Sequence, residues 1–530
     1  MTCSTPHRRR PSRRSRASRA PVTVAKARGQ LHPQAQQVGP ERFGILCVDC
    51  AKARSTWMLA DFYGRILFPP TDVCHTRGEM EATISQLQQT LARDGIADAI
   101  AVVERTGSYH LLPKQALARA GWQVRIVHPL ATRQFRQSAD AGNKTDQTDL
   151  MAIHRAAVTG LGLTEQTLEE PYQKLRLLVR HRRALVSMTT QLRCQIHHHL
   201  HAAMPGFGAL FRDLWSSPMP MTIVREVGSA AAVAQMGQAE LARLLHQRRI
   251  THQQRSLDKV VAWAHAAPPP DDNAATHHQF CIQLDEGLAN LHHLIQDTER
   301  QIAQLLVLTP YILLLSIPGI NVVSAGELAG EMGPITHYAS ATCITGRAGL
   351  YPSRYQSDRT DHPDGPLVRR GNRRLRRALM IIAENLLTCN GHFRGKAQYW
   401  ELQGKNKAKA RVKVANNFAR IAFQMVAGRM VFAHRCCRER DYVLHKLVEF
   451  ACAHQMPGEQ LLHALQAATG QLPAAEHKAE GEKLQPWLRR PHRSRNQEPQ
   501  SLGEILPQVL AELGLTAVLE SAPLRSQGSS

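Results

Sequence analysis

The sequence lacks a long apolar segment and an ordered set of cysteines, and each absence excludes a class of protein. No stretch approaches the roughly 20 apolar residues that span a membrane. The most apolar one, from Leu305 to Ile320, is interrupted by Pro310 and Pro318. The 11 cysteines show no spacing of a secreted disulfide framework, which is typical of a reducing compartment. We therefore expect a cytoplasmic, nucleoid-associated protein without a membrane segment.

Acidic charge is also scarce, since 43 Asp and Glu stand against 66 Lys and Arg, for a formal net charge of +23. Folding does not require such an excess, so it predicts a polyanionic partner, DNA or RNA, bound in a salt-sensitive manner. Residues 1–40 contain many arginines but no acid and no apolar signal segment. We expect residues 1–41 to be a disordered basic arm on nucleic acid.

The pattern of residues 42–164 is that of a mixed α/β domain. Apolar runs predict strands, and amphipathic runs predict helices. The predicted strands are 43–49, 55–62, 65–68, 99–104 and 122–128, and the predicted helices are 78–93, 109–120 and 146–158. Three early strands, a helix, and then alternating strands and helices fit the RNase H-like fold, in which acids gather at strand ends and on a late helix.

The remainder of the chain is predicted to be mostly helical. Residues 165–305 carry two heptad stripes, which favour a helical hairpin or an intersubunit coiled coil. The segment 206–283 interrupts these stripes as an insertion, with a loop near 267–271. Residues 306–450 are expected to form a second, mostly α globular domain, and residues 451–530 a polar C-terminal tail.

Four carboxylates occupy positions where acidic charge is costly. Asp49 and Glu104 end two apolar strands, and Asp146 and Asp149 share one face of a predicted helix. Two such charges 4 Å apart repel by about 4 kcal/mol at an effective dielectric of 20, and a divalent cation removes that repulsion. Oxygen ligands suit Mg²⁺ or Mn²⁺, so the four acids predict a metal site that acts on phosphodiesters. The alternative is that Asp146 caps a helix and Glu104 pairs with Arg105.

A second group of residues combines loop hydroxyls with clustered arginines. Ser353 and Ser357 lie in the loop that follows Gly349-Leu350-Tyr351-Pro352. Guanidinium groups bind phosphate in a bidentate manner, and a serine beside them could attack phosphorus. The residues expected to bind nucleic acid are Arg369, Arg370, Asn372, Arg373, Arg374, Arg376 and Arg377.

Taken together, these motifs resemble a known family: the DEDD transposases of the insertion-sequence family numbered one-ten, also described as bridge-RNA-guided serine recombinases. Asp49, Glu104, Asp146 and Asp149 match its four acids in order. The stretches 177–185, 317–320, 349–352 and 370–376 also match its motifs. The resemblance covers roughly 43–205 and 285–435.

The resemblance implies a RuvC-like N-terminal domain that binds Mg²⁺ and a C-terminal transposase domain with a serine nucleophile. It implies a phosphoserine link to DNA. It also implies that the acids and the serine meet in a composite site of a tetramer built from dimers, and that a structured bridge RNA pairs with donor and target DNA. Carried onto this sequence, the nucleophile is Ser357. Asp358 stands where the family has Gly, so Ser353 remains the alternative nucleophile.

The leading hypothesis is therefore a transposase that cuts and rejoins DNA by phosphodiester strand transfer. One alternative is a RuvC-like nuclease or resolvase of branched DNA that uses metal-activated water. Another is a nucleic-acid-binding scaffold whose site is inactive, which four intact acids argue against.

Overall fold

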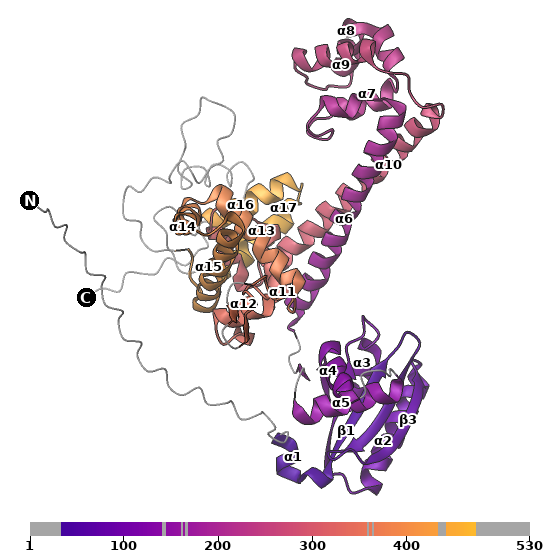
Figure 1. The fold of residues 1–530 in the computed structure, drawn as a ribbon, viewed down its shortest axis with the longest axis vertical. Coiled ribbons are helices and arrows are strands. Elements are labelled where there is room, and N and C mark those ends of the chain that lie inside the picture. The colour runs from indigo at the N-terminus through magenta and orange to yellow at the C-terminus, as the bar shows by residue number, and fades with distance from the viewer. Residues whose placement is uncertain are drawn as a thin grey trace, which may run out of the picture. The chain divides into compact units, whose positions relative to one another are not determined.

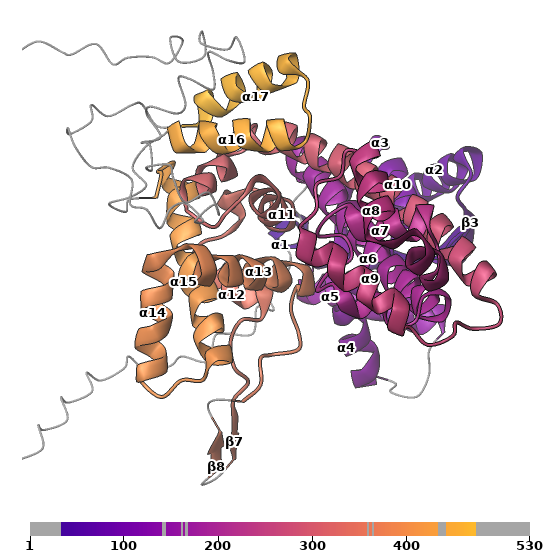
Figure 2. The same ribbon diagram turned by 90° about the horizontal axis from the view of Figure 1, so that it is seen from above.

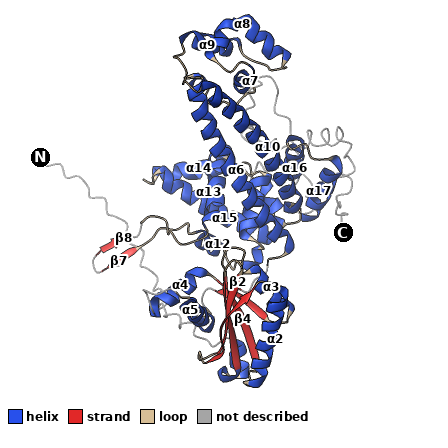
Figure 3. Ribbon diagram, turned by 90° about the vertical axis from the view of Figure 1, so that its right-hand side faces the viewer, coloured by secondary structure: helices blue, strands red, loops and turns tan. Residues whose placement is uncertain are grey.

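The computed structural model describes residues 33–139, 145–160, 163–164, 168–357, 360–362, 365–432 and 441–472. It divides into two compact units, Met1–Thr167 and Leu168–Ser530, and each is described here by itself. Within the described ranges, no helix is long and apolar enough to cross a membrane. Unit 1 is mixed α/β and unit 2 is almost entirely helical (Figure 3).

Unit 1 is built on a six-stranded sheet with the order β3-β2-β1-β4-β5-β6. Its strands are β1 (Phe43–Cys50), β2 (Arg54–Asp61), β3 (Ile66–Cys74), β4 (Asp98–Glu104), β5 (Gln123–Val127) and β6 (Leu163–Thr164). Strands β1, β4 and β5 are parallel, whereas β2, β3 and β6 run antiparallel to their neighbours. The mixed sheet and its strand order agree with the predicted RNase H-like domain.

Helices cover both faces of this sheet because β1, β2 and β4 bury side chains on both sides (Figure 1). Ile45 and Val102 face one core with α5, and Leu46 and Val103 face the other with α2 and α3. The helices of unit 1 are α1 (Pro33–Val38), α2 (Arg77–Arg93), α3 (Leu111–Arg119), α4 (Pro129–Ala139) and α5 (Asp146–Thr159). The result is a three-layer domain.

Helix α1 lies inside the stretch that the sequence analysis assigns to a disordered arm. Its Ala35 is fully buried in the core of unit 1, and Gln34 donates a hydrogen bond of 3.0 Å to Asp98. The folded part of unit 1 therefore includes residues before 42, because the buried Ala35 packs this segment onto the sheet. Residues 1–32 of the predicted arm lie outside the described residues.

Unit 2 begins with a long helical hairpin. Helices α6 (Glu170–Ala203) and α10 (Ala274–Leu306) run side by side along most of their length (Figures 1 and 3). Buried residues on both helices follow the predicted stripes, among them Leu175, Leu185, Leu288 and Ile302. The predicted pair of packed helices is thus present, and supercoiling or pairing between subunits stays a prediction.

The predicted insertion 206–283 forms a small helical subdomain at the tip of this hairpin. It contains α7 (Met219–Glu226), α8 (Ala230–Gln247) and α9 (Gln254–Ala266), and residues 267–273 form the predicted loop. A separate core joins Leu241 and Val260 to Ile196 and Leu288 of the hairpin. The insertion is therefore packed onto the hairpin by apolar contacts of its own.

The body of unit 2 packs against the other end of the hairpin (Figure 1), and Figure 2 shows a two-stranded ribbon, Tyr355–Ser357 with Thr360–His362, projecting from it. Its elements are α11 (Val322–Met332), α12 (Ala341–Ala348), β7 (Tyr355–Ser357), β8 (Thr360–His362), α13 (Arg373–Cys389), α14 (Gly391–Leu402), α15 (Lys407–Gly428), α16 (Asp441–Ala453) and α17 (Gly458–Gln471), with short 3₁₀ turns at Pro310–Ser316 and Ile335–His337. Helix α17 falls in the predicted polar tail, yet Leu461 and Leu465 are buried in this core. Their i, i+4 spacing gives the helix an apolar face.

Candidate active site and nucleic-acid interface

Asp49 and Glu104 lie at the carboxyl ends of two neighbouring parallel strands. Val48 of β1 is in register with Val103 of β4, so the next residue on each strand is one of these acids. The side chains are hydrogen-bonded to each other, and burial raises the pKa of Asp49. Burial and the Asp49 charge also raise the pKa of Glu104 to about 7. Burial and neighbouring negative charges therefore disfavour the charged form of each carboxylate, as expected for neighbouring carboxylates without a cation.

Helix α5 brings the other two acids to the same edge of the sheet. Thr145 caps its N-terminus, where the Thr148 amide donates to Thr145 Oγ1 and the Thr145 amide donates to Thr148 Oγ1. This cap fixes Asp146 as the first helical residue and Asp149 one turn later. Asp149 is buried and Asp146 exposed, and the charges of both raise the pKa of Asp49. Asp49 is thus within electrostatic reach of the other three predicted acids.

One residue near this edge was missed by the sequence analysis. Arg136 of α4 donates a hydrogen bond from Nη1 to Oδ1 of Asp149. The two side chains retain only 20% and 5% of their exposure, so the ion pair is largely shielded from water. Arg136 carries no recognisable motif, and only the fold shows that it meets the acids.

The oxygen donors at this edge fit a hard divalent cation in chemical type. Burial and neighbouring negative charges disfavour the charged forms of Asp49 and Glu104, which is the condition that a cation would relieve. Among the residues that the structure describes, however, no three His, Cys, Asp or Glu side chains converge as a ready metal site. Asp49 and Glu104 are the two carboxylates in direct contact, and Asp149 is held by Arg136.

Ser357 and Ser353 differ in what holds their hydroxyl groups. Ser357 is exposed at the end of β7, where it pairs with Thr360 of β8, and none of the described residues forms a hydrogen bond with its hydroxyl. Ser353 Oγ donates to the Pro366 carbonyl at 2.9 Å, in the loop that supports the two-stranded ribbon of β7 and β8. Asp358, which replaces the family's Gly, lies outside the described residues.

The predicted arginine cluster separates into two groups. Asn372 caps α13 by accepting from the Leu375 amide, and Arg376 donates from Nε to the Ala348 carbonyl at 2.8 Å. These two side chains therefore serve the packing of the body. The other five arginines are exposed: Arg369, Arg370, Arg373, Arg374 and Arg377.

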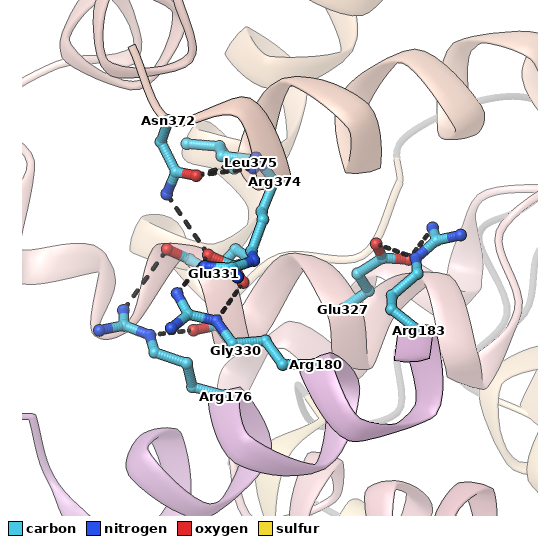
Figure 4. Close-up of polar contacts among 9 residues, drawn as sticks. All are labelled: Arg176, Arg180, Arg183, Glu327, Gly330, Glu331, Asn372, Arg374 and Leu375. Atoms are coloured by element: carbon cyan, nitrogen blue, oxygen red, sulfur yellow. Dashed lines mark hydrogen bonds and ion pairs between the residues drawn. The ribbon is translucent and has the colours of Figure 1, made fainter. Parts of the chain in front are cut away.

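A charged cavity of about 280 Å³ lies where α6, α11 and α13 meet. Arg180 pairs with Glu331 at 2.8 and 3.0 Å, and Arg183 pairs with Glu327 in the same bidentate manner (Figure 4). Arg374 and Arg377 also line the cavity, and no ion pair to either is present among the described residues. Since the two glutamates already have partners, the cavity presents unbalanced positive charge.

Comparisons with known proteins match both halves of this chain. Residues 46–205, which include the four acids, match a DEDD model described as "Transposase". Residues 311–398, which include Ser357 and the arginine cluster, match the model "Transposase IS116/IS110/IS902 family". The whole predicted insertion, 206–283, lies between the two matched segments.

Two relatives support the same grouping. An uncharacterized 43.6 kDa protein of insertion element IS110 from Streptomyces coelicolor is 24% identical over 331 residues, covering 62% of this chain and 81% of the relative. The transposase for insertion sequence element IS1328 from Yersinia enterocolitica is 23% identical over 363 residues, covering 68% and 93%. The family numbered one-ten in the sequence analysis is this one, and the chain is related to the insertion-sequence transposases of the IS110 family.

Proposed function

We propose that this protein moves an insertion sequence by cutting and rejoining DNA through a phosphoserine at Ser357. The observation that carries the proposal is the half-buried Asp49–Glu104 pair, near the buried Asp149, inside a segment that matches a transposase model. Carboxylates that repel one another and are partly removed from water destabilise a fold, so their concentration at a strand edge indicates a function.

The chemistry assigned to the site is phosphoryl transfer. The Ser357 hydroxyl gives up its proton as Oγ forms a bond to phosphorus and the bond from phosphorus to a sugar oxygen breaks. The leaving oxygen takes up one proton to become a hydroxyl, so the step consumes no net proton. A hydroxyl of another DNA end reverses these steps, which rejoins the strand and frees the serine. A Mg²⁺ or Mn²⁺ ion, when bound, supplies positive charge for the phosphoryl oxygens. Asp49, Glu104, Asp146 and Asp149 are the residues proposed to hold it.

The surroundings of the two serines favour Ser357 as the nucleophile. Its hydroxyl is on an exposed strand, so a DNA backbone can approach it. Ser353 would first have to break its hydrogen bond to Pro366, and Gly365 lies against its hydroxyl. Arg354 and Asp361 join β7 and β8 by two hydrogen bonds of 2.9 and 2.8 Å, which supports the strand that bears Ser357.

The partners proposed are donor DNA, target DNA and a structured guide RNA, with the chain assembled as a tetramer. The five exposed arginines beside α13 bind the phosphate backbone in this proposal, whereas Asn372 and Arg376 hold the loop in place. The net charge of +23 is compatible with binding several nucleic-acid strands at once.

A strand-exchange assay tests the role of the acids. Purified protein is combined with Mg²⁺, DNA carrying the element ends, target DNA and RNA transcribed from the element's flanks. We expect Asp49→Asn and Glu104→Gln to abolish exchange, and Asp72→Asn to retain it, because Asp72 is exposed on β3. Unchanged exchange in the first two variants would mean that these acids take no part in the reaction, whereas no exchange by the wild type would support a scaffold with no active site. Exchange without RNA would contradict guidance.

The second candidate is a metal-dependent nuclease that uses activated water, which the same acids would serve. The two functions differ in their need for Ser357. Under the nuclease, Ser357→Ala retains metal-dependent cleavage and no strand is rejoined. Under the proposed recombinase, Ser357→Ala loses cleavage and exchange together, while Ser353→Ala retains both.

A further inference from the structure

Helix α4 directs two side chains toward the carboxylates. Thr132 and Arg136 are i, i+4 on this helix and therefore lie on one face. Thr132 is buried beside Glu104, and Arg136 donates to Asp149. Arg133, between them in sequence, is exposed. The face of α4 that meets the acids thus delivers one positive charge to them.

Asp149 consequently has its charge balanced by a residue of the chain itself. The guanidinium donates to Oδ1, and both side chains are largely removed from water. In such surroundings a charge pair interacts more strongly than on the surface. A cation bound at the Asp149 carboxylate would lie close to the Arg136 guanidinium, and two positive charges at such a distance repel each other where water is largely excluded.

We infer that Arg136 competes with the divalent cation for Asp149 and so sets the metal affinity of the free protein. Arg136 is a positioning residue: it holds Asp149 and α4 in a metal-free arrangement, and the carboxylate becomes a ligand only when the guanidinium withdraws. A phosphate group of bound DNA is an anion that could take up the withdrawn guanidinium. This inference rests on the proposed role of the four acids.

Metal binding in the absence of DNA tests the inference. Mn²⁺ is titrated into the full-length wild type, Arg136→Gln, Arg136→Met and Arg136→Lys, with Arg133→Gln as the matched control on the same helix. Thermal unfolding is recorded for each variant to show that it is folded. The Kd for Mn²⁺ is measured by calorimetry, and Asp149→Asn serves to assign the binding to this site.

We expect Arg136→Gln and Arg136→Met to bind Mn²⁺ about tenfold more tightly, because a unit positive charge at close range has been removed. Arg136→Lys and Arg133→Gln should bind as the wild type does. A purely structural role for Arg136 would weaken binding in every Arg136 variant that loses the ion pair. Unchanged or weaker binding in both folded variants would overturn the inference and leave the proposed recombinase standing. If neither they nor the wild type bound Mn²⁺, the proposed acid site would fail, and this inference with it.

Discussion

The ion pair between Arg180 and Glu331 should be one of the strongest single contributors to the stability of unit 2. Glu331 is only 2% exposed and accepts two hydrogen bonds from Arg180 and one of 3.4 Å from Asn372. Burial alone would raise the pKa of its carboxyl, yet Arg180 outweighs that effect and the pKa is lowered. The charged Glu331 therefore contributes its full stability at pH values above the unfolded pKa of about 4.5. That stability is lost as the pH falls through the lower pKa of the folded protein.

Replacing Glu331 with Gln keeps the shape of the side chain and removes the charge that balances Arg180. Breaking one partner of a buried ion pair typically costs about 3–5 kcal/mol. Arg180 keeps 28% of its side-chain exposure, so we take the lower end, about 3 kcal/mol. At an unfolding entropy of about 2.1 cal/mol/K per residue, a unit of roughly 300 residues loses about 1.6 °C per kcal/mol, so we expect the melting temperature to fall by about 5 °C.

Thermal unfolding followed by circular dichroism and calorimetry measures this effect on the transition of unit 2. Glu170→Gln is the control, since Glu170 pairs with Lys174 on the surface of α6 and should lower the melting temperature by no more than about 3 °C. Arg180→Met in combination with Glu331→Gln should cost less than the sum of the two single changes. A decrease below about 3 °C for Glu331→Gln, or strict additivity in the double variant, would refute the reasoning.

Three further predictions concern pH, nucleic-acid affinity and helix packing. Burial lowers the pKa of His154, whose Nε2 lies 2.8 Å from the Asp61 carbonyl. Below about pH 6.5 the unfolded chain therefore takes up a proton that the folded protein does not, so the stability of unit 1 should fall. His154→Gln should flatten this pH dependence in thermal unfolding between pH 5 and 8. An unaltered pH profile in this variant would contradict the prediction. Arg374→Ala combined with Arg377→Ala should weaken DNA binding in a filter or anisotropy assay and reduce the slope of log K against log salt by about 2. The matched double Lys variant should retain the slope. An unchanged slope in the double Ala variant would show that neither arginine contacts the DNA backbone. A Cβ on Gly330 would lie 3.0 Å from the Leu175 carbonyl carbon and 3.1 Å from the Arg176 backbone nitrogen. Gly330→Ala should therefore lower the free energy of unfolding by about 1–3 kcal/mol, whereas Gly346→Ala, where the space is open, should leave it unchanged or raise it. Equal melting temperatures for both variants would refute close packing of α11 on α6.

The sheet and the acids of unit 1 could be predicted because their signals are local. An apolar run followed by a carboxylate at Asp49 and again at Glu104 defines strand ends. Four of the five predicted strands begin and end within one residue of the prediction, whereas β3 continues to Cys74, beyond the predicted end at residue 68. Thr145 precedes the two aspartates of α5 in the capping position, which also depends only on neighbouring residues.

The partners of these residues could not be predicted, because they depend on how separate elements pack. Arg136 belongs to a charged segment with no motif, and its contact with Asp149 arises only when α4 lies against α5. The arginine cluster illustrates the same limit. Arg376 and Arg377 are adjacent in sequence, yet Arg376 donates a hydrogen bond to the Ala348 carbonyl, whereas Arg377 is exposed beside a cavity.

The central claim is that Ser357 becomes covalently linked to DNA, and trapping that link tests it most directly. Wild-type protein is incubated with Mg²⁺, guide RNA and labelled DNA, stopped under denaturing conditions, digested with protease and analysed by mass spectrometry. The account predicts a nucleotide attached to the peptide that contains Ser357, absent from Ser357→Ala and present in Ser353→Ala. Metal-dependent nicks without any adduct, or an adduct on Ser353, would contradict it.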